Sequence, residues 1–436
     1  MNKTQQQIRD YFFSQKDEIC THLKHLMEIK SISDDRKACK EALRYVIKLA
    51  ESFGMKTAVG KHDDVGVIEI GEGRLTLGIL AHVDVVDEGS LAAWNYEPFT
   101  LTETDGMFYG RGIVDDKGPV IVSLYAMKFL LEQVPKFQRK IQLIVGSSEE
   151  SVWTDMVHFK EEFQLPDYGY SPDGNFPIFH VENGYMDVVL EFTQELPEPC
   201  EAFRSGSSEN SVPSEAEFVC CGQIRRFQGK AAHSSTPELG ENAMLKMAEA
   251  LPEPKPDFAR FLCDFFPEGC YASLLPLEKD SRVKNDGPAL PTTIVPTILK
   301  QDGKRVSINF NIRQAFDIPN ENILAAFEQE KDVYHYEIHI KENLSPIFVD
   351  EHQPWLMRMK DVYESYGKKC EFLPAPGCTY AKMIPNFVSW GPVFPEDLDC
   401  AHMENEEISV DSFLLGAEIY TAYLYQEAIL LGQKCT

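Results

Sequence analysis

The chain lacks the features of a membrane protein and of a disulfide-bonded scaffold. No apolar run reaches the roughly 18 residues that a membrane-spanning helix needs, and the polar residues 1–7 do not resemble a secretory signal. The 11 cysteines are odd in number and scattered, and none forms a CxxC pair. This cysteine usage is typical of a reduced protein, so we expect a cytoplasmic location and no membrane partner.

Positive charge is also scarce. The sequence has 42 Lys and Arg residues against 69 Asp and Glu residues, which gives a formal net charge of −27. A nucleic-acid-binding surface needs a basic patch to neutralise phosphates, so we expect no nucleic-acid partner. The acidic excess does not name a partner of its own, because a solvated acidic surface explains it equally well.

The remaining composition is that of an ordinary globular protein. Hydrophobic residues make up 43% of the chain and charged residues 25%. At 436 residues the chain exceeds what one hydrophobic core usually serves, so two domains are expected.

Helices and strands are predicted to alternate in the first third of the chain. Helices have apolar residues on one face, and strands are short β-branched runs. The predicted segments are residues 5–30, 39–53, 65–70, 75–81, 117–132 and 140–146. Such alternation predicts an α/β sheet with helices packed on it.

The pattern changes between residues 183 and 344, which we interpret as an inserted α+β domain. Its predicted strands and helices lie at residues 186–192, 216–227, 241–250, 257–266, 306–313 and 320–330. Residues 195–213, rich in Glu, Ser and Pro, predict a loop or linker. The first domain is then split into residues 1–182 and 345–436, and it ends with a predicted helix at 411–432.

Five residues of metal-binding types stand in short motifs of the split domain. Two imidazoles and three carboxylates can hold two divalent ions if one carboxylate bridges them, and such a pair activates water for hydrolysis. Zn²⁺, Mn²⁺ and Co²⁺ all suit this set, and the sequence does not separate them. The five residues are His82, Asp115, Glu150, Asp173 and His402.

Taken singly, each motif also has an ordinary structural explanation. His82 and Asp84 share one strand face, where the acid can fix the imidazole or simply pair with a core histidine. Asp115 precedes a helix, where Asp is a common cap. Of Glu149 and Glu150, one can bind metal while the other acts as general base, or both can lie on a surface loop. Their common order along the chain favours the metal site.

These motifs resemble the co-catalytic metallopeptidases that include carboxypeptidase G, carnosinase, succinyl-diaminopimelate desuccinylase and, most similar, the PepV-type dipeptidases. The resemblance covers most of the chain. It is strongest at His82–Val86, Tyr109–Pro119, Glu149–Glu150, Ser171–Asp173, Asn210, His233, Arg313, Gly377–Tyr380 and His402–Glu406.

The resemblance implies a mixed-sheet, phosphorylase/hydrolase-like α/β catalytic domain with an inserted α+β lid domain. It also implies two divalent ions, Zn²⁺ or Mn²⁺. One is held by His82 and Asp173, the other by Glu150 and His402, with Asp115 bridging.

The same resemblance implies roles around the metals. Asp84 orients His82, and Glu149 is the general base that deprotonates the water and then protonates the leaving amine. The peptide bond between Asp115 and Asp116 is expected to be cis.

Substrate-binding roles are also implied by the resemblance. His233, a lid histidine, stabilises the oxyanion of the tetrahedral intermediate. Asn210 and Arg313 hold the substrate carboxylate or the oxyanion. The turn containing Gly377, Thr379 and Tyr380 lines the substrate pocket.

Three departures from the family pattern bear on substrate and assembly. Asp87 stands where proline is usual, and Ala381-Lys382 replaces a small residue followed by arginine. His233 follows Asn210 by only 23 positions, which indicates a trimmed lid. Because Asn210 precedes His233 in one chain, a monomer is favoured over a homodimer.

The predicted function is hydrolysis of free dipeptides. The alternative within enzymes is an N-acyl amino acid deacylase or desuccinylase, whose substrate lacks the free amine. A non-catalytic metal- or peptide-binding module is the alternative from another class. Glu149 favours catalysis, because a binding module needs no base beside its ligands.

Overall fold

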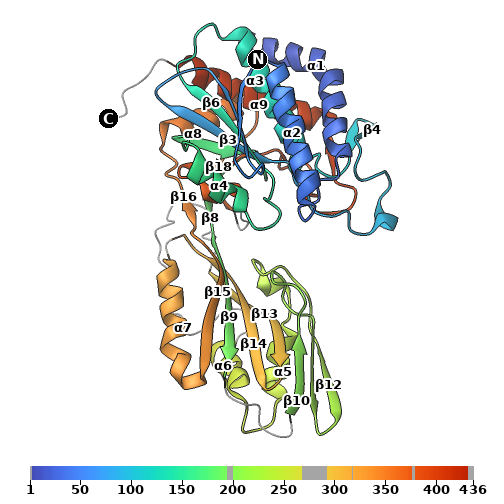
Figure 1. Ribbon diagram of the computed structural model, residues 1–436, viewed down its shortest axis with the longest axis vertical. Coiled ribbons are helices and arrows are strands. Elements are labelled where there is room, and N and C mark those ends of the chain that lie inside the picture. Colours follow the sequence, from blue (N-terminus) through green and yellow to red (C-terminus); the bar gives the residue numbers. More distant parts are fainter. Residues whose placement is uncertain (1, 194–199, 268–291, 317, 376–378, 431–436) are drawn as a thin grey trace. The chain divides into compact units, whose positions relative to one another are not determined.

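The structure of the protein is a computed structural model that describes residues 2–193, 200–267, 292–316, 318–375 and 379–430. The chain divides into two compact units (Figure 1). Unit 1 comprises Met1–His180, Val349–Leu373 and Thr379–Thr436, and unit 2 comprises Val181–Phe348 and Pro374–Cys378.

The nine-stranded sheet, most of which belongs to unit 1, is mixed. Its central strand β3 runs parallel to β6 and β7, and β18 runs parallel to β7, whereas β1, β2, β8 and β16 pair antiparallel with their neighbours. The order is β1 (Lys56–Val59), β2 (Gly66–Ile70), β6 (Lys140–Gly146), β3 (Thr76–His82), β7 (Tyr168–Ser171), β18 (Phe387–Ser389), β8 (Ile178–Glu182) and β16 (Ile347–Phe348), with β17 (Phe372–Ala375) beside β8. A small sheet joins β19 (Glu407–Ser409), β5 (Met107–Tyr109) and β4 (Thr102–Thr104).

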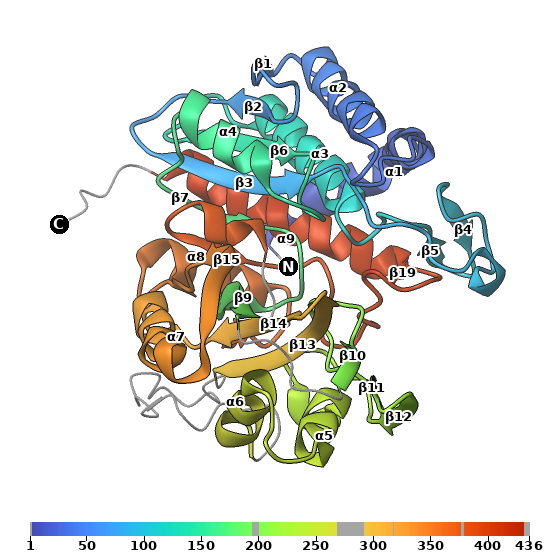
Figure 2. The same ribbon diagram turned by 60° about the horizontal axis from the view of Figure 1, so that its bottom comes forward.

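The central strands are buried on both faces. Both β3 and β6 are buried along six consecutive residues, as expected for parallel strands covered by helices. The helices of unit 1 are α1 (Lys3–Glu28), α2 (Arg36–Ser52), α3 (Lys117–Gln133), α4 (Thr154–Glu162), α8 (Pro354–Ser365) and α9 (Val410–Ile429). Figure 2 shows α1, α3 and α9, which pack against one another.

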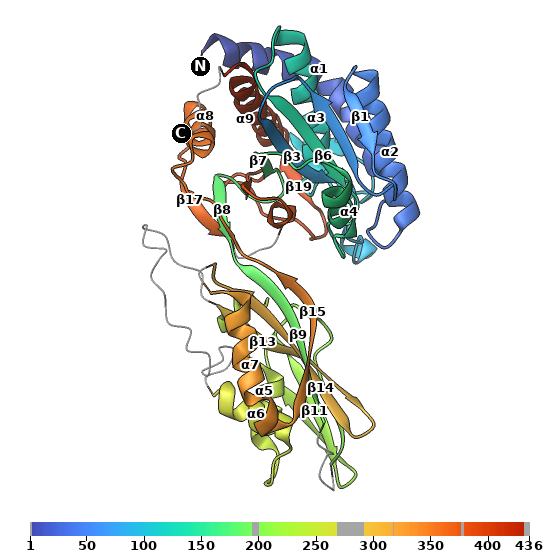
Figure 3. The same ribbon diagram turned by 60° about the vertical axis from the view of Figure 1, so that its left-hand side comes forward.

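The second unit is built on a seven-stranded antiparallel sheet. The order is β12 (Gln223–Gln228), β11 (Glu215–Cys220), β10 (Cys200–Ser205), β13 (Thr293–Asp302), β14 (Arg305–Gln314), β9 (Gly184–Phe192) and β15 (Tyr336–Leu344). Figure 3 shows α5 (Ala243–Ala250), α6 (Asp257–Phe265) and α7 (Asn320–Tyr334) on one face. Val188 and Phe310 pack with Phe261 in the core.

This architecture confirms the predicted fold class: a mixed α/β sheet with packed helices and a separate domain with an antiparallel sheet. Within the described ranges, no helix is both long and apolar enough to cross a membrane. Short 3₁₀ helices lie at η1 (Leu91–Ala93), η2 (Pro237–Leu239) and η3 (Tyr380–Met383).

Two local predictions were wrong. The single strand expected at residues 216–227 is a hairpin of β11 and β12, because Cys221 and Gly222 form a two-residue turn with φ of 53° and 69°. Such positive-φ turns are those that connect hairpin strands. The loop expected at 195–213 contains β10, which is a strand because it pairs with β11 and β13. The predicted last helix ends at Ile429, and residues 431–432 lie outside the described ranges.

Candidate metal centre

The candidate ligands gather where parallel strands end. His82 is the last residue of β3, Glu149 and Glu150 follow β6, and Asp173 follows β7. Because these strands run parallel, their carboxyl ends share one edge of the sheet, which is where open α/β sheets bind ligands. Asp115 precedes α3, and His402 lies in the turn before β19.

The ligand atoms form two groups of three. Those of His82, Glu149 and Asp173 lie within 4.8 Å of one another, and so do those of Asp115, Glu150 and His402. The structure therefore brings together all five predicted ligands and the predicted base. Glu149 lies in the group that the sequence assigned to His82 and Asp173.

Asp115 lies between the two imidazoles. Its Oδ1 is 3.0 Å from Nε2 of His82, and its Oδ2 is 3.0 Å from Nε2 of His402. His402 Nε2 is also 3.1 Å from Oε2 of Glu150, and His82 Nε2 is 3.6 Å from Oδ2 of Asp173. One carboxylate oxygen toward each imidazole is the arrangement that a bridging ligand requires.

The buried atoms of this centre fit divalent cations. His82 is fully buried, and its Nδ1 lies 2.9 Å from the backbone oxygen of Asp84, which makes Nδ1 the protonated nitrogen. Among the described residues, neither Nε2 of His82 nor Oδ1 of Asp115 has a hydrogen-bond partner. An imidazole lone pair that faces carboxylate oxygens is repelled unless a cation lies with them, and nitrogen and oxygen are suitable donors for Zn²⁺ or Mn²⁺.

Burial and the close approach of the acids to one another raise the pKa values of three carboxyl groups. Burial raises the pKa of the Glu149 carboxyl well above its usual value, and the charge of Asp173 adds to this. Burial also raises the pKa of Glu150 to about 7, with a further contribution from Asp115. Burial raises the pKa of Asp173 as well. Buried carboxyl groups this close together are costly to ionise unless a cation lies among them.

The pKa values of the two imidazoles are raised as well, which favours their charged form. Burial alone lowers the pKa of His82, but the nearby carboxylates of Asp115, Asp173 and Asp84 outweigh it and raise the pKa well above its usual value. Hydrogen bonds to Asp115 and Glu150 raise the pKa of His402 to about 11. The carboxylates therefore stabilise a cation at this position, whether a proton or a metal ion.

Asp84 connects two of the ligand-bearing loops. Its carboxylate accepts hydrogen bonds from the backbone N–H groups of Glu149 and Glu150, both at 3.1 Å, and from Oγ of Ser33 at 2.7 Å. The same carboxylate lies 3.4 Å from Nδ1 of His82, farther than the Asp84 backbone oxygen. Asp84 therefore contacts the imidazole mainly through its carbonyl, while its carboxylate holds the turn after β6.

The peptide bond between Asp115 and Asp116 is cis, as expected. The side chain of Asp116 does not serve the first turn of α3. Its Oδ2 accepts a hydrogen bond from the backbone N–H of His82 at 3.0 Å, so this residue also supports the centre.

Glu406 is a supporting residue to which the sequence assigned no role. Its buried carboxylate accepts hydrogen bonds from the backbone N–H groups of Gly112, Val114 and Asp115, at 2.9 to 3.2 Å, and from the Arg111 guanidinium at 2.8 Å. Charge-assisted bonds of this kind offset the cost of burying a carboxylate. Glu406 thereby ties the His402 motif to the loop that presents Asp115.

The sequence also assigned no role to Asp155. This residue explains why the Tyr380 side chain is held where it is. Oδ2 of Asp155 accepts hydrogen bonds from the N–H groups of Ser147 and Ser148, at 2.5 and 2.9 Å, and from the Tyr380 hydroxyl at 2.6 Å. Tyr380 is fully buried. Its side chain therefore holds the loop that carries the two glutamates.

Of the remaining residues in the predicted substrate-pocket turn, the structure describes Thr379. Oγ1 of Thr379 accepts a hydrogen bond from the N–H of Ala381 at 3.2 Å and lies 3.0 Å from Oγ of Ser389. Gly377 lies outside the described residues. The role of this turn in substrate binding stays a prediction.

In unit 2, Asn210 and His233 lie on adjacent loops. The backbone oxygen of Asn210 accepts a hydrogen bond from the N–H of Ser234 at 2.9 Å, and its side chain accepts one from Ser208. Nδ1 of His233 accepts from the N–H of Ser235 at 3.2 Å, which assigns the ring proton to Nε2. Nε2 is therefore the nitrogen that can donate to a substrate.

Arg313, on β14, is buried. Its Nε donates a hydrogen bond to Oδ1 of Asn311 at 3.3 Å, and its guanidinium carbon lies 4.5 Å from the ring centroid of Tyr185. Burial lowers the pKa of His233, and the positive charge of Arg313 adds to that effect. Near neutral pH, His233 is thus a neutral donor rather than a cation.

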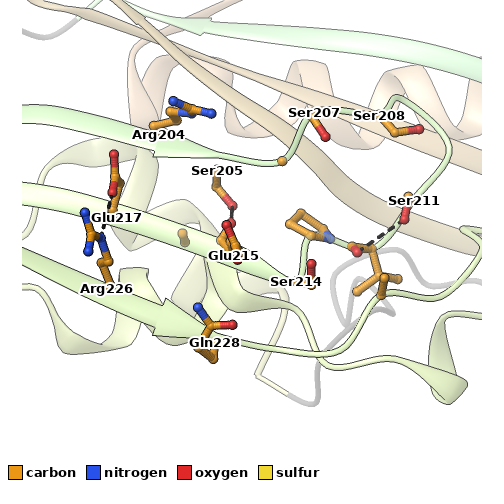
Figure 4. A pocket seen from close by; sticks show the side chains of 15 residues that line it. Arg204, Ser205, Ser207, Ser208, Ser211, Ser214, Glu215, Glu217, Arg226 and Gln228 are labelled. Carbon is orange, nitrogen blue, oxygen red and sulfur yellow. Dashed lines mark hydrogen bonds and ion pairs between the residues drawn. The ribbon is translucent and has the colours of Figure 1, made fainter.

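Unit 2 also has an open pocket of about 640 Å³, shown in Figure 4. Among the described residues that form its wall, none is Asn210, His233 or Arg313. The labelled lining residues are Arg204, Ser205, Ser207, Ser208, Ser211, Ser214, Glu215, Glu217, Arg226 and Gln228.

The chain is similar to known peptidases in sequence and in fold. The profile of peptidase family M20/M25/M40 matches residues 78–426. A predicted dipeptidase of Staphylococcus saprophyticus is 30% identical to the chain, over 96% of this chain and 98% of the relative. The predicted dipeptidase YtjP of Bacillus subtilis is 27% identical, over 95% and 98%.

Solved structures show the same fold. Human carnosine dipeptidase 1 aligns with a TM-score of 0.68 at 17% identity, over 98% of this chain and all of the other. The dipeptidase Dug1p of Saccharomyces cerevisiae aligns with a TM-score of 0.69 at 14% identity, over 99% and 100%. YXEP of Bacillus subtilis, described as a dinuclear metal-binding peptidase, aligns with a TM-score of 0.55 at 11% identity, over 95% and 100%.

Proposed function

Because the chain belongs to peptidase family M20/M25/M40, we propose that it is a two-metal dipeptidase that hydrolyses the peptide bond of free dipeptides. The observation that carries this proposal is the pair of ligand groups with Asp115 between their imidazoles. The relatives that are described as dipeptidases support the substrate class.

We assign the ligands as the geometry suggests. His82 and Asp173 would hold one divalent ion, Glu150 and His402 the other, and Asp115 would bridge them. When bound, two such ions supply Lewis acidity, which lowers the pKa of a water molecule and polarises the scissile carbonyl.

Glu149 is the proposed proton carrier. Its carboxyl lies with the His82 group, and burial raises its pKa well above the usual value. A raised pKa lets the carboxylate accept a proton from the attacking water and return it to the leaving amine. Asp84 fixes the backbone N–H groups of Glu149 and its neighbour, so the base is held in place.

Two residues of unit 2 are proposed to act on the substrate itself. The planar guanidinium of Arg313 suits a bidentate bond to the C-terminal carboxylate. Nε2–H of His233 is a neutral donor that suits the oxyanion formed in the transition state. Asn210 is proposed to assist one of these contacts.

The test is an assay of substrate class. Metal-free protein would be reconstituted with Mn²⁺ or Zn²⁺ and given free dipeptides, including β-Ala-His, beside their N-acetylated forms. We expect hydrolysis of the free dipeptides only, and loss of that activity in Glu149→Ala.

Other outcomes point elsewhere. Cleavage of the acetylated substrates would move the protein to the deacylases, because such substrates lack a free amine. If no substrate were hydrolysed with either metal, catalysis would be contradicted and a binding module favoured.

A further inference from the structure

The register of unit 2 places two polar pairs side by side. On the neighbouring strands β9 and β14, Tyr185 lies opposite Arg313, and Asp187 lies opposite Asn311. Because side chains alternate along a strand, all four lie on the sheet face away from Val188 and its apolar core. The pairing across two strands thus brings an acid, an amide, a phenol and a guanidinium together.

These four side chains close into a ring. Nε of Arg313 donates to Oδ1 of Asn311 at 3.3 Å, and Nδ2 of Asn311 donates to Oδ1 of Asp187 at 3.1 Å. The Tyr185 hydroxyl donates to Oδ2 of Asp187 at 2.5 Å, and the Tyr185 ring faces the Arg313 guanidinium at 4.5 Å. Every link in the ring restrains the orientation of the guanidinium.

Burial makes the ring rigid. Asn311 is fully buried, and Asp187 and Arg313 expose only 2% and 6% of their surface. Asn311 is suited to its position because an amide offers both an acceptor for the guanidinium and a donor for the carboxylate. In a buried setting, a broken link leaves a polar group without its partner, which is costly.

The ring is also joined to the His233 loop. Oγ of Ser234 donates to Oδ1 of Asn311 at 2.7 Å, and the N–H of Ser234 donates to the backbone oxygen of Asn210 at 2.9 Å. Ser234 directly follows His233 and is itself fully buried. Asn311 is therefore the shared acceptor for the strand that carries Arg313 and the loop that carries His233.

We propose that Asn311 and Asp187 are positioning residues that set selectivity for a free C-terminal carboxylate, by holding Arg313 in the orientation that binds it. This inference rests on the proposed function, in which Arg313 binds the substrate carboxylate. A bidentate bond depends on the plane of the guanidinium, so a rotated Arg313 would lose the carboxylate specifically.

The experiment compares each dipeptide with its C-terminal amide. For the metal-loaded protein, kcat/KM is measured on both substrates, and their ratio reports carboxylate recognition. We expect Asn311→Ala to lower this acid-to-amide ratio by about 10- to 100-fold, the size of effect that misplacement of a binding group produces. The change should lie mainly in KM for the acid, with metal content unaltered.

Asn242→Ala is the matched control. Asn242 is also a buried amide of unit 2, but its side chain donates to the backbone oxygen of Pro296 and accepts from the N–H of Met244, both at 2.9 Å. Neither partner belongs to the ring, so this variant should keep the wild-type ratio. Tyr185→Phe is a milder second variant, which keeps the ring against Arg313 and removes only the bond to Asp187.

Each outcome is decisive. Equal loss on acid and amide in Asn311→Ala, or an unchanged ratio in both Asn311→Ala and Tyr185→Phe, would overturn the positioning role and leave the dipeptidase assignment intact. A wild-type protein that cleaves acid and amide equally well would overturn it too. A wild-type protein inactive on all dipeptides would contradict the proposed function, and the inference with it.

Discussion

The metal centre of unit 1 and the Asp187 network of unit 2 treat buried charge in opposite ways. In unit 1, acids crowd around the imidazoles of His82 and His402, yet within the described ranges His82 Nε2 and Asp115 Oδ1 have no hydrogen-bond partner. In unit 2, both oxygens of the buried Asp187 accept hydrogen bonds. Acceptor atoms without a hydrogen-bond partner in an acidic cluster indicate a place for a cation, whereas a satisfied network indicates a group that the protein itself positions.

Removal of the metal is expected to have the largest effect on the centre in unit 1. Chelation should abolish dipeptide hydrolysis and lower the thermal stability of the protein, because Glu149, Glu150 and Asp173 are then left crowded without a cation. Readdition of Mn²⁺ or Zn²⁺ should restore both, as measured by an activity assay and calorimetry. His82→Ala should not be restored. Full activity after exhaustive chelation would contradict the metal centre.

Replacement of the proposed base separates chemistry from metal binding. Glu149→Gln should lower kcat by about 10²- to 10⁴-fold, the usual contribution of a general base, with KM and metal content near wild type. Glu161→Gln, an exposed acid on α4, is the control and should behave as wild type. Because Glu149 lies in the His82 group, loss of one metal ion in Glu149→Gln would show instead that it is a ligand.

The third prediction compares two buried carboxylates within unit 1. Glu406 holds the Asp115 loop, whereas Glu427 binds Arg139 and Arg358 and accepts a hydrogen bond from Tyr168. Glu406→Gln should weaken metal affinity by about 10- to 100-fold, as loss of a group that orients a ligand typically does. Titration calorimetry of metal-free protein with Mn²⁺ measures this.

Glu427→Gln provides the matched control, since both carboxylates are fully buried and paired with arginine. Both variants should melt at a lower temperature, but only Glu406→Gln should lose metal affinity. Equal affinity in the two variants would mean that Glu406 serves the fold alone.

The sequence predicted those features of the site that short local patterns determine. His82 and Glu150 could be found because each stands at the end of a predicted apolar strand, and parallel strands bring their carboxyl ends together. Asp173 was found through its Ser-Pro-Asp motif. Glu406 and Asp155 were missed because their partners are backbone N–H groups of loops, and no pattern of side chains identifies such acceptors. The contacts exist only once the topology is fixed.

Register limited the prediction in unit 2. Asp187 and Asn311 are 124 positions apart, and only the antiparallel pairing of β9 with β14 makes them neighbours. A shift of one residue would turn one of the two side chains toward the apolar core, and the sequence alone does not state the register. The same reason explains why β10 was taken for a loop, since its pairing, and not its composition, makes it a strand.

The smallest expected effect is a change in the pKa of His233 when Arg313 is replaced. Burial lowers its pKa and Arg313 adds to the shift, so Arg313→Ala should raise the pKa toward the ordinary histidine value, because removing a nearby cation eases protonation. NMR titration of the ring, assigned with His233→Asn, measures the change. Arg226→Ala, whose arginine pairs with Glu217, should leave it unaltered.

An unchanged His233 pKa in Arg313→Ala would separate the two residues electrostatically and weaken their joint role. A raised pKa would mean that the neutral Nε2–H donor is lost at a higher pH than in the wild type, because protonation then begins sooner as pH falls. In unit 1 the acids raise the pKa of both imidazoles, whereas in unit 2 burial and an arginine lower that of His233. Opposite neighbours thus prepare one kind of side chain for two tasks, holding a cation and donating a neutral hydrogen bond.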